Sequence, residues 1–181
     1  MAVMSKYRCH NCALECIVGD IARQADMQAV VNAANAELQI GGGVAGALHR
    51  AAGPGLAREC APMAPIRPGE AVISSGHDLP NDYVIHVLGP VYGVDEPAAE
   101  YLAACHDQAI RLAARQGIAS IAFPAVSTGA FGYPMQEAAE VAIAATCRTL
   151  AEVSGVSRVR FVLFDEAAHA VYNRAIAAAV R

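Results

Sequence analysis

The stretch AVVNAAN at residues 29–35, followed by GGGVAG at residues 41–46, decides the fold of this chain. An apolar run of the strand type leads into two asparagines and then into a glycine loop, and a helix-like segment follows until Gly53-Pro54 stops it. Glycine lets backbone N–H groups approach a phosphate closely, and a helix N-terminus adds partial positive charge. The stretch therefore predicts a strand, an anion-binding loop and a helix in that order.

Two phosphate-binding motifs share this order of elements but do not fit the loop. A Walker A loop needs Lys and then Ser or Thr after its last glycine, where this chain has Ala47-Leu48. The glycines have the spacing of a dinucleotide-binding fingerprint, but residues 35–40 separate them from the strand, and no convincing acidic residue follows about twenty positions later. A tight turn that packs a helix on a sheet is a structural alternative for this loop taken alone.

A second glycine-containing loop has the same relation to a strand and a helix. The sequence STGAFGYP at residues 127–134 follows the apolar run 118–123 and precedes a helical segment. In a sheet with parallel neighbours, both loops would open at the same edge, where α/β folds bind their ligands. Two phosphate-binding loops that face each other suit a diphosphate better than a single phosphate.

Together these motifs resemble those of the macrodomain family. The segments NAAN at 32–35, GGGVAG at 41–46, YVIHVLGP at 83–90 and STGAFGYP at 127–134 stand in that family's order and spacing, and Gly19-Asp20-Ile21 fits its opening motif. The resemblance runs from about Cys16 to the C-terminus. It is strongest to the MacroD-type branch, whose members bind ADP-ribose and remove it from proteins.

The pattern of apolar segments predicts alternating strands and helices. The expected strands are Leu14–Val18, Ala29–Asn32, Ala71–Ser74, Tyr83–Val87, Ile118–Phe123 and Val159–Phe164. The expected helices are Gly43–Ala52, Pro97–Gln116, Pro134–Val153 and Glu166–Val180. This gives an α/β fold with a mixed sheet of about six strands, and the resemblance likewise implies a three-layer α/β/α sandwich. We expect a single macrodomain over residues 1–181, with residues 1–12 as a flexible N-terminal extension.

Composition limits the partners and the location. The 181 residues are enough for one sizeable core, and 55% of them are hydrophobic while 17% are charged. Because no apolar run reaches the roughly 18 residues of a membrane span, and the N-terminus lacks an apolar signal core, we expect a cytoplasmic protein without a membrane partner. We also expect a monomer. A net charge of −4 without a basic stripe argues against nucleic acid as a partner, except as an ADP-ribosylated substrate.

The resemblance implies roles for individual residues in binding ADP-ribose. Asp20 would accept a hydrogen bond from the adenine amino group beside the N–H of Ile21, although Asp20 also suits a helix cap. Asn35 would hold the distal ribose, because an amide offers a donor and an acceptor to vicinal hydroxyls. Phe164 would pack either on adenine or in the core. The two loops would enclose the diphosphate and distal ribose through Gly42, Gly43, Val44, Ala45 and Gly46 on one side and Ser127, Thr128, Gly129, Ala130 and Phe131 on the other.

The implied reaction is hydrolysis at the anomeric carbon of the distal ribose. It removes mono-ADP-ribose from the acidic side chains of modified proteins. We expect Asn35, Gly42, Gly43 and Phe131 to act in it, without a cofactor. Ala45 stands where the MacroD-type branch has an aspartate that has been proposed to position the attacking water. The glycine loop of this chain is similar to that of viral macrodomains, which include active hydrolases that lack this aspartate. An oxocarbenium-like transition state needs little nucleophilic push, so the ligand's phosphate could orient the water.

Two further residues have structural interpretations. Asn32 is expected to bridge backbone groups at the end of its strand. His49 matches a MacroD-type histidine, but a lone histidine on a helix packs or forms hydrogen bonds more often than it catalyses.

Other functions fit parts of the pattern. Ala45 favours a module that recognises ADP-ribose without turnover, and a deacetylase of O-acetyl-ADP-ribose would use the same pocket. A zinc protein is raised by Cys9-His10-Asn11-Cys12 and Cys16, because the Cys-x-x-Cys spacing fits a metal. Structural zinc sites draw a second ligand pair from elsewhere, however, and the remaining cysteines, at positions 60, 105 and 147, are scattered singly. We therefore expect reduced, unpaired thiols and no metal.

Overall fold

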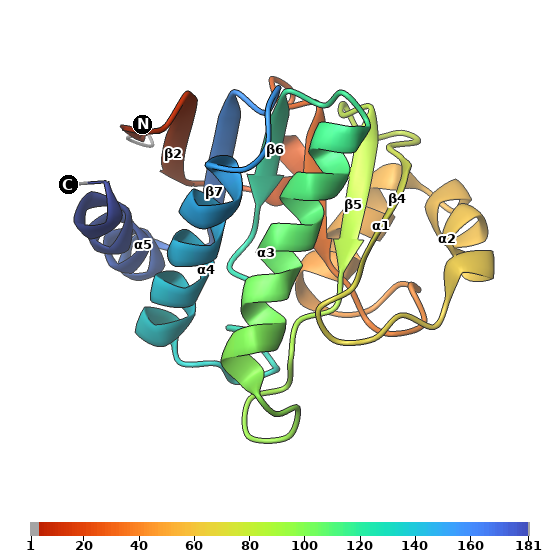
Figure 1. Cartoon of the computed structure of the whole chain (residues 1–181). Helices are drawn as coiled ribbons and strands as arrows, with labels where there is room; N and C mark the ends of the chain where they lie inside the picture. The colour runs from red at the N-terminus through yellow and green to blue at the C-terminus, as the bar shows by residue number, and fades with distance from the viewer. Residues whose placement is uncertain (1–3, 181) are drawn as a thin grey trace.

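The computed structural model describes residues 4–180 and places a seven-stranded mixed sheet between two helical layers (Figure 1). The strands are β1 Ser5–Cys9, β2 Cys12–Val18, β3 Ala29–Ala33, β4 Ala71–Ser75, β5 Tyr83–Val87, β6 Ser120–Phe123 and β7 Arg158–Leu163. The helices are α1 Gly43–Ala52, α2 Gly55–Cys60, α3 Ala98–Arg115, α4 Met135–Leu150 and α5 Glu166–Ala179, with short 3-10 turns η1 Ile21–Arg23 and η2 Ala61–Met63. The expected three-layer α/β/α sandwich is confirmed.

The strand order brings the two glycine loops to neighbouring strands. Across the sheet the order is β1-β2-β7-β6-β3-β5-β4, with parallel inner strands and antiparallel strands β1 and β4 at the edges. The chain leaves β3 toward β4 and β5 but leaves β6 toward β7, so its direction across the sheet switches between β3 and β6. Ligands of open α/β sheets bind at such a switch point, outside the carboxyl ends of the strands.

The inner strands are apolar because both of their faces are covered. Helices α3, α4 and α5 pack on one face and α1 and α2 on the other (Figure 1). The neighbours Val30 and Val31 on β3 point to opposite faces and belong to different core clusters, one with Leu48 of α1 and one with Leu102 of α3. Each fully buried side chain of this size contributes roughly 1.5–3 kcal/mol.

The structure differs from the sequence prediction at the N-terminus and after α1. Residues 5–9, expected within a flexible extension, form β1 and pair with β2 across a turn at His10-Asn11; Met1–Val3 of that expected extension lie outside the described residues. Helix α2 was not predicted, because Gly53-Pro54 before it reads as a loop. The other predicted elements are present, with small shifts at their ends.

Candidate functional site

A cavity of about 390 Å³ opens at the carboxyl ends of β3, β5 and β6. Three connections supply its wall, which comprises Ala33, Ala34, Asn35, Gly41, Gly42, Gly43, Val44, Ala45, Gly89, Ala125, Val126, Ser127, Gly129, Ala130 and Phe131. The volume falls within the range of roughly 300–1,000 Å³ that is usual for small-molecule sites. The two glycine loops therefore face each other across one cavity.

The N-terminus of α1 forms one wall. Gly42 is the N-cap with extended backbone, and the N–H of Gly46 donates to its carbonyl at 3.2 Å. The N–H groups of residues 43–45 precede that bond, so they have no acceptor within the helix. They lie where the helix dipole favours a bound anion. Gly43 has φ of +56°, which glycine adopts without the strain of a side chain.

Gly46 allows the glycine loop to fold back against the helix. A methyl group at Gly46 would overlap the carbonyl oxygen of Gly41 and would lie 2.8 Å from Nη1 of Arg50. At Gly42 and Gly43, in contrast, a Cβ would stand in open space, without a close contact to another part of the chain. Gly46 is therefore required for packing, whereas the other two present bare backbone.

The side-chain amide of Asn35 forms two hydrogen bonds within the segment that leads from β3 into the glycine loop. Its Nδ2 donates to the carbonyl of Gln39 at 2.9 Å, and its Oδ1 accepts from the N–H of Gln39 at 3.0 Å. A primary amide has two N–H donors and two acceptor lone pairs. One of each is left for a ligand hydroxyl, and Asn35 lies in the cavity wall.

Ser127 in the opposite loop has two features of a functional residue. Its φ of +66° is a left-handed conformation that a non-glycine residue seldom adopts. Its Oγ is buried and has no hydrogen-bond partner within residues 4–180, although most buried hydroxyls are paired. A methyl group at Gly89 would overlap this Oγ. Thr128 differs, because its Oγ1 already donates to the carbonyl of Ala125 at 2.8 Å.

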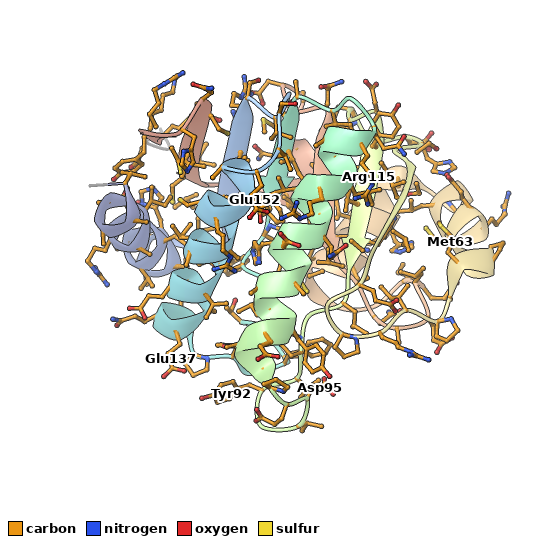
Figure 2. The ribbon with its side chains drawn as sticks, in the orientation of Figure 1. Met63, Tyr92, Asp95, Arg115, Glu137 and Glu152 are labelled. Atoms are coloured by element: carbon orange, nitrogen blue, oxygen red, sulfur yellow. The ribbon has the colours of Figure 1, made fainter. Side chains whose placement is uncertain are left out.

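The connection between β5 and α3 supports the second loop. The N–H of Tyr92 donates to the carbonyl of Phe131 at 2.9 Å, and the Tyr92 ring packs on Tyr133 with ring centroids 4.8 Å apart. The hydroxyl of Tyr92 also donates to Glu137 at 3.3 Å. Figure 2 shows Tyr92, Asp95 and Glu137 together at the end of the molecule where α3 and α4 begin. These contacts fix the backbone of Phe131, which lines the cavity.

The residues expected to bind adenine lie outside the cavity wall, just after the carboxyl ends of the paired parallel strands β2 and β7. Oδ1 of Asp20 accepts from the N–H of Ala22 at 2.9 Å, so the expected helix-cap role is confirmed. Ile21 is buried, whereas Phe164 is 93% exposed. The alternative that Phe164 is a core aromatic is therefore wrong, and its ring is accessible from solvent.

Asn32 is structural, but the expected bridge to backbone groups is wrong. Its Nδ2 donates to Nδ1 of His86 at 3.1 Å, and Nε2 of His86 lies 2.8 Å from Oγ of Ser74. Burial lowers the pKa of His86 to about 4, so this ring is neutral at pH 7. His49 is also buried, outside the cavity wall, and burial lowers its pKa. The bonds among Asn32, His86 and Ser74 thus link β3, β5 and β4 beneath the site.

The cavity brings together most of the residues predicted from sequence. Its wall includes Asn35, Gly42, Gly43, Val44, Ala45, Ser127, Gly129, Ala130 and Phe131, but not Asp20, Ile21, Gly46, Thr128 or Phe164. Gly89 is a wall residue that the role assignment missed, and the Gly-Pro pair directly after β5 was the signal that could have found it. No wall residue within the described chain has an ionisable side chain, so an anion here would be held by backbone N–H groups and by neutral side-chain donors such as the Ser127 hydroxyl.

The thiols offer no metal centre in the described chain. All six cysteines are free, and residues 4–180 hold no group of three His, Cys, Asp or Glu side chains placed to bind a metal ion. Burial raises the pKa of the Cys12 and Cys16 thiols to about 12. No helix in the same residues is long and apolar enough to cross a membrane.

Sequence comparisons identify similar proteins over most of the chain. The Macro domain family matches residues 31–142. The chain is 45% identical over 168 residues to the O-acetyl-ADP-ribose deacetylase of Klebsiella pneumoniae (strain 342), with 90% of this chain and 95% of that protein covered. It is 42% identical over 169 residues to a macro domain-containing protein of Chlorobaculum tepidum, with 93% and 98% covered.

Solved structures resemble the whole fold. The Oceanobacillus iheyensis macrodomain with ADP superposes with a TM-score of 0.95 at 36% identity, covering 99% of this chain and 98% of that one. The Trypanosoma brucei macrodomain in complex with ADP-ribose superposes with a TM-score of 0.84 at 36% identity, covering 90% and 68%.

Proposed function

We propose that this chain, which belongs to the macrodomain family, binds ADP-ribose and hydrolyses mono-ADP-ribosyl esters on acidic side chains of proteins. One observation carries the proposal: two loops at the strand-order switch point face each other across a cavity whose wall is uncharged. Such a wall suits a diphosphate held by backbone N–H groups. The solved relatives with ADP and with ADP-ribose support the same class of ligand.

The proposed binding mode uses each part of the site. The N–H groups of residues 43–45 take the diphosphate from one side, and the loop of residues 127–131 takes it from the other. The free donor and acceptor of Asn35 hold the distal ribose, and Phe131 packs on its ring. Adenine lies toward Asp20 and the exposed ring of Phe164.

The proposed reaction is attack by water on C1″ of the distal ribose. The water oxygen bonds to C1″ as the bond from C1″ to the carboxylate oxygen breaks, the side chain leaves as a carboxylate, and the water loses a proton to solvent. Positive charge on the ribose develops mainly from departure of the leaving group, as in other glycosyl transfers. Asn35 fixes the ribose, the backbone of Gly42 and Gly43 places the diphosphate, and a phosphate oxygen orients the water.

A second function is favoured by one specific observation, the name of the Klebsiella relative, which is an O-acetyl-ADP-ribose deacetylase at 45% identity. In that reaction the water would attack the acetyl carbonyl carbon instead of C1″. Both substrates carry a carboxylate ester on the distal ribose, so one cavity suits both. A non-catalytic reader is the third possibility, and Ala45 is its support.

Calorimetry with ADP-ribose and a hydrolysis assay in water enriched in oxygen-18 test the proposal together. The substrates are a mono-ADP-ribosylated, automodified transferase and O-acetyl-ADP-ribose. We expect binding, release of ADP-ribose from the modified protein, and no heavy oxygen in the freed carboxylate, because C1″ is attacked. Binding without release from protein would leave a reader or a deacetylase, and label in the carboxylate would rule out attack at C1″.

Replacing Ala45 with aspartate is expected to raise kcat for the modified protein by about tenfold or more. Ala45 is the third residue of α1 and lies in the cavity wall, where a carboxylate would be favoured by the helix dipole and could orient the water. Ala45→Asn is the matched control, since it has the same size without a base and should not accelerate the reaction. Equal rates for both variants would contradict the idea that the native chain is slow because residue 45 lacks a carboxylate to orient the water.

A further inference from the structure

A buried arginine anchors the connection between β2 and β3. Arg160 on β7 is 4% exposed, and its Nε donates at 2.9 Å to Glu15, the neighbouring residue in register on β2. Its two terminal nitrogens reach the carboxylate of Asp26 in the connection, at 2.8 and 2.6 Å. The hydrogen bond from Arg160 holds the pKa of Asp26 below its usual range, so the pair stays charged at neutral pH.

Gln24 extends this anchor to Asp20. Its side chain is buried, its Oε1 accepts from Nη1 of Arg160 at 2.8 Å, and its Nε2 donates to the backbone carbonyl of Asp20 at 2.8 Å. The amide of Asn81 holds the backbone carbonyl of Gln24 at 2.8 Å. Because both ends of the Gln24 amide are used, only one orientation satisfies them. A continuous chain of bonds thus runs from the sheet through Gln24 to Asp20.

Stability alone gives little reason for this network. A buried ion pair contributes about as much as apolar residues of the same volume, whereas a fully bonded polar network fixes one geometry. Between Val18 and Ala29 the only helical or strand element is η1, three residues long. Within residues 4–180, the long-range backbone bonds of this connection lie at its two ends, at Gly19 and Gln28. Between these ends, the connection therefore depends on side-chain bonds such as those of Gln24 for its place on the sheet.

We infer that Gln24 is a positioning residue for adenine recognition. It holds the backbone of Asp20 at a fixed place on the sheet, while the N–H of Ala22 at 2.9 Å orients Oδ1 of the carboxylate. Oδ2 faces Nε of Arg23 at 3.8 Å, an ion-pair distance too long for a hydrogen bond, so this oxygen still accepts a donor from the ligand; the Asp20 side chain is 53% exposed. The inference rests on the proposed function, because it takes the adenine of ADP-ribose as the group that Asp20 reads.

The test is the preference for adenine over hypoxanthine, measured by calorimetry with ADP-ribose and its hypoxanthine analogue. Hypoxanthine has a carbonyl where adenine has the amino donor, so the native chain should prefer ADP-ribose by about tenfold or more, as for a hydrogen bond to a charged group. Gln24→Met keeps the length of the side chain without its bonds, and we expect the preference to fall to about twofold or less. Affinity for the analogue should change little.

Two further variants make the test specific. Gln24→Glu keeps the acceptor for Arg160 but loses the donor to Asp20, so it should also lose the preference. Gln28→Met is the matched control, because Gln28 lies in the same connection but accepts from the N–H of Ala119 at 2.7 Å, and it should keep the native preference.

The outcomes separate this inference from the proposed function. If Gln24→Met keeps the native preference, or weakens both nucleotides equally, the role of Gln24 is overturned, as it is if the native chain binds both alike. If the native chain binds neither nucleotide, the proposed function itself fails. Melting temperatures of all variants show whether each is folded.

Discussion

Replacing Gly46 with alanine is expected to weaken ADP-ribose binding about 100-fold or more, the loss of one or two hydrogen bonds to a charged group. The new methyl group would overlap the carbonyl oxygen of Gly41. That oxygen belongs to the backbone, so the overlap is relieved only if the glycine loop moves away from α1. The backbone of the displaced glycine loop and the N–H groups of residues 43–45 would then no longer be placed to bind the diphosphate at the same time. Calorimetry with ADP-ribose measures the effect.

Ala51→Gly is the matched control for Gly46→Ala. Ala51 is an exposed residue on the same helix, and glycine there costs about 1 kcal/mol of helix stability without a steric overlap. We expect the control to melt at a lower temperature and to bind ADP-ribose as the native chain does. A folded Gly46→Ala protein with native affinity would show that the packing of loop against helix does not determine binding.

The fold could be predicted where each segment carries its own signal. Strand β5 was predicted to its ends because its apolar run lies between Asn81-Asp82 and Gly89-Pro90. Strand β1 could not, since Lys6 and Arg8 interrupt it and its five residues are ordered by pairing with β2. Helix α2 is short and follows Gly53-Pro54, a pair that is typical of a loop, so the sequence pattern did not indicate a helix there.

The site could be predicted in outline, because glycine loops after strands carry their own pattern. The pattern could not show which residues of each loop line the cavity and which ones hold the loop in place. Gly46 contacts the carbonyl of Gly41 instead of the cavity, and the Thr128 hydroxyl is already bonded to Ala125. The partner of Asn32 is His86, 54 positions away. Such contacts depend on the folded backbone and leave no local trace in the sequence.

The uncharged wall of the cavity limits the kind of catalysis that this chain can perform. Without an ionisable side chain in the described wall, the proposed reaction would be accelerated by positioning of the distal ribose and the water, and by hydrogen bonds that strengthen as charge develops. Asn35 is the wall residue whose side chain has both a free donor and a free acceptor after its own loop bonds are made. Its removal should therefore have a large effect.

Asn35→Ala is expected to lower kcat/KM for the mono-ADP-ribosylated protein about 100-fold or more, from the loss of two loop bonds and the bonds to the ribose. The fall should be larger in kcat than in the affinity for ADP-ribose, because the geometry of the ribose matters most in the transition state. Initial rates across substrate concentrations, with calorimetry on the same samples, give both quantities.

Gln39→Ala separates the amide of Asn35 from the loop around it. Both bonds of Asn35 go to the backbone of Gln39, while the Gln39 side chain donates to the carbonyls of Leu38 and Ala57 at 3.3 and 3.4 Å. The truncated side chain should therefore leave the Asn35 bonds and the turnover near native levels. Asn35→Asp keeps the acceptor for the Gln39 N–H but loses both donors, so its rate should fall between those of the native chain and Asn35→Ala. If Gln39→Ala lowered the rate as much as Asn35→Ala does, the conformation of the loop, and not the amide of Asn35, would support catalysis.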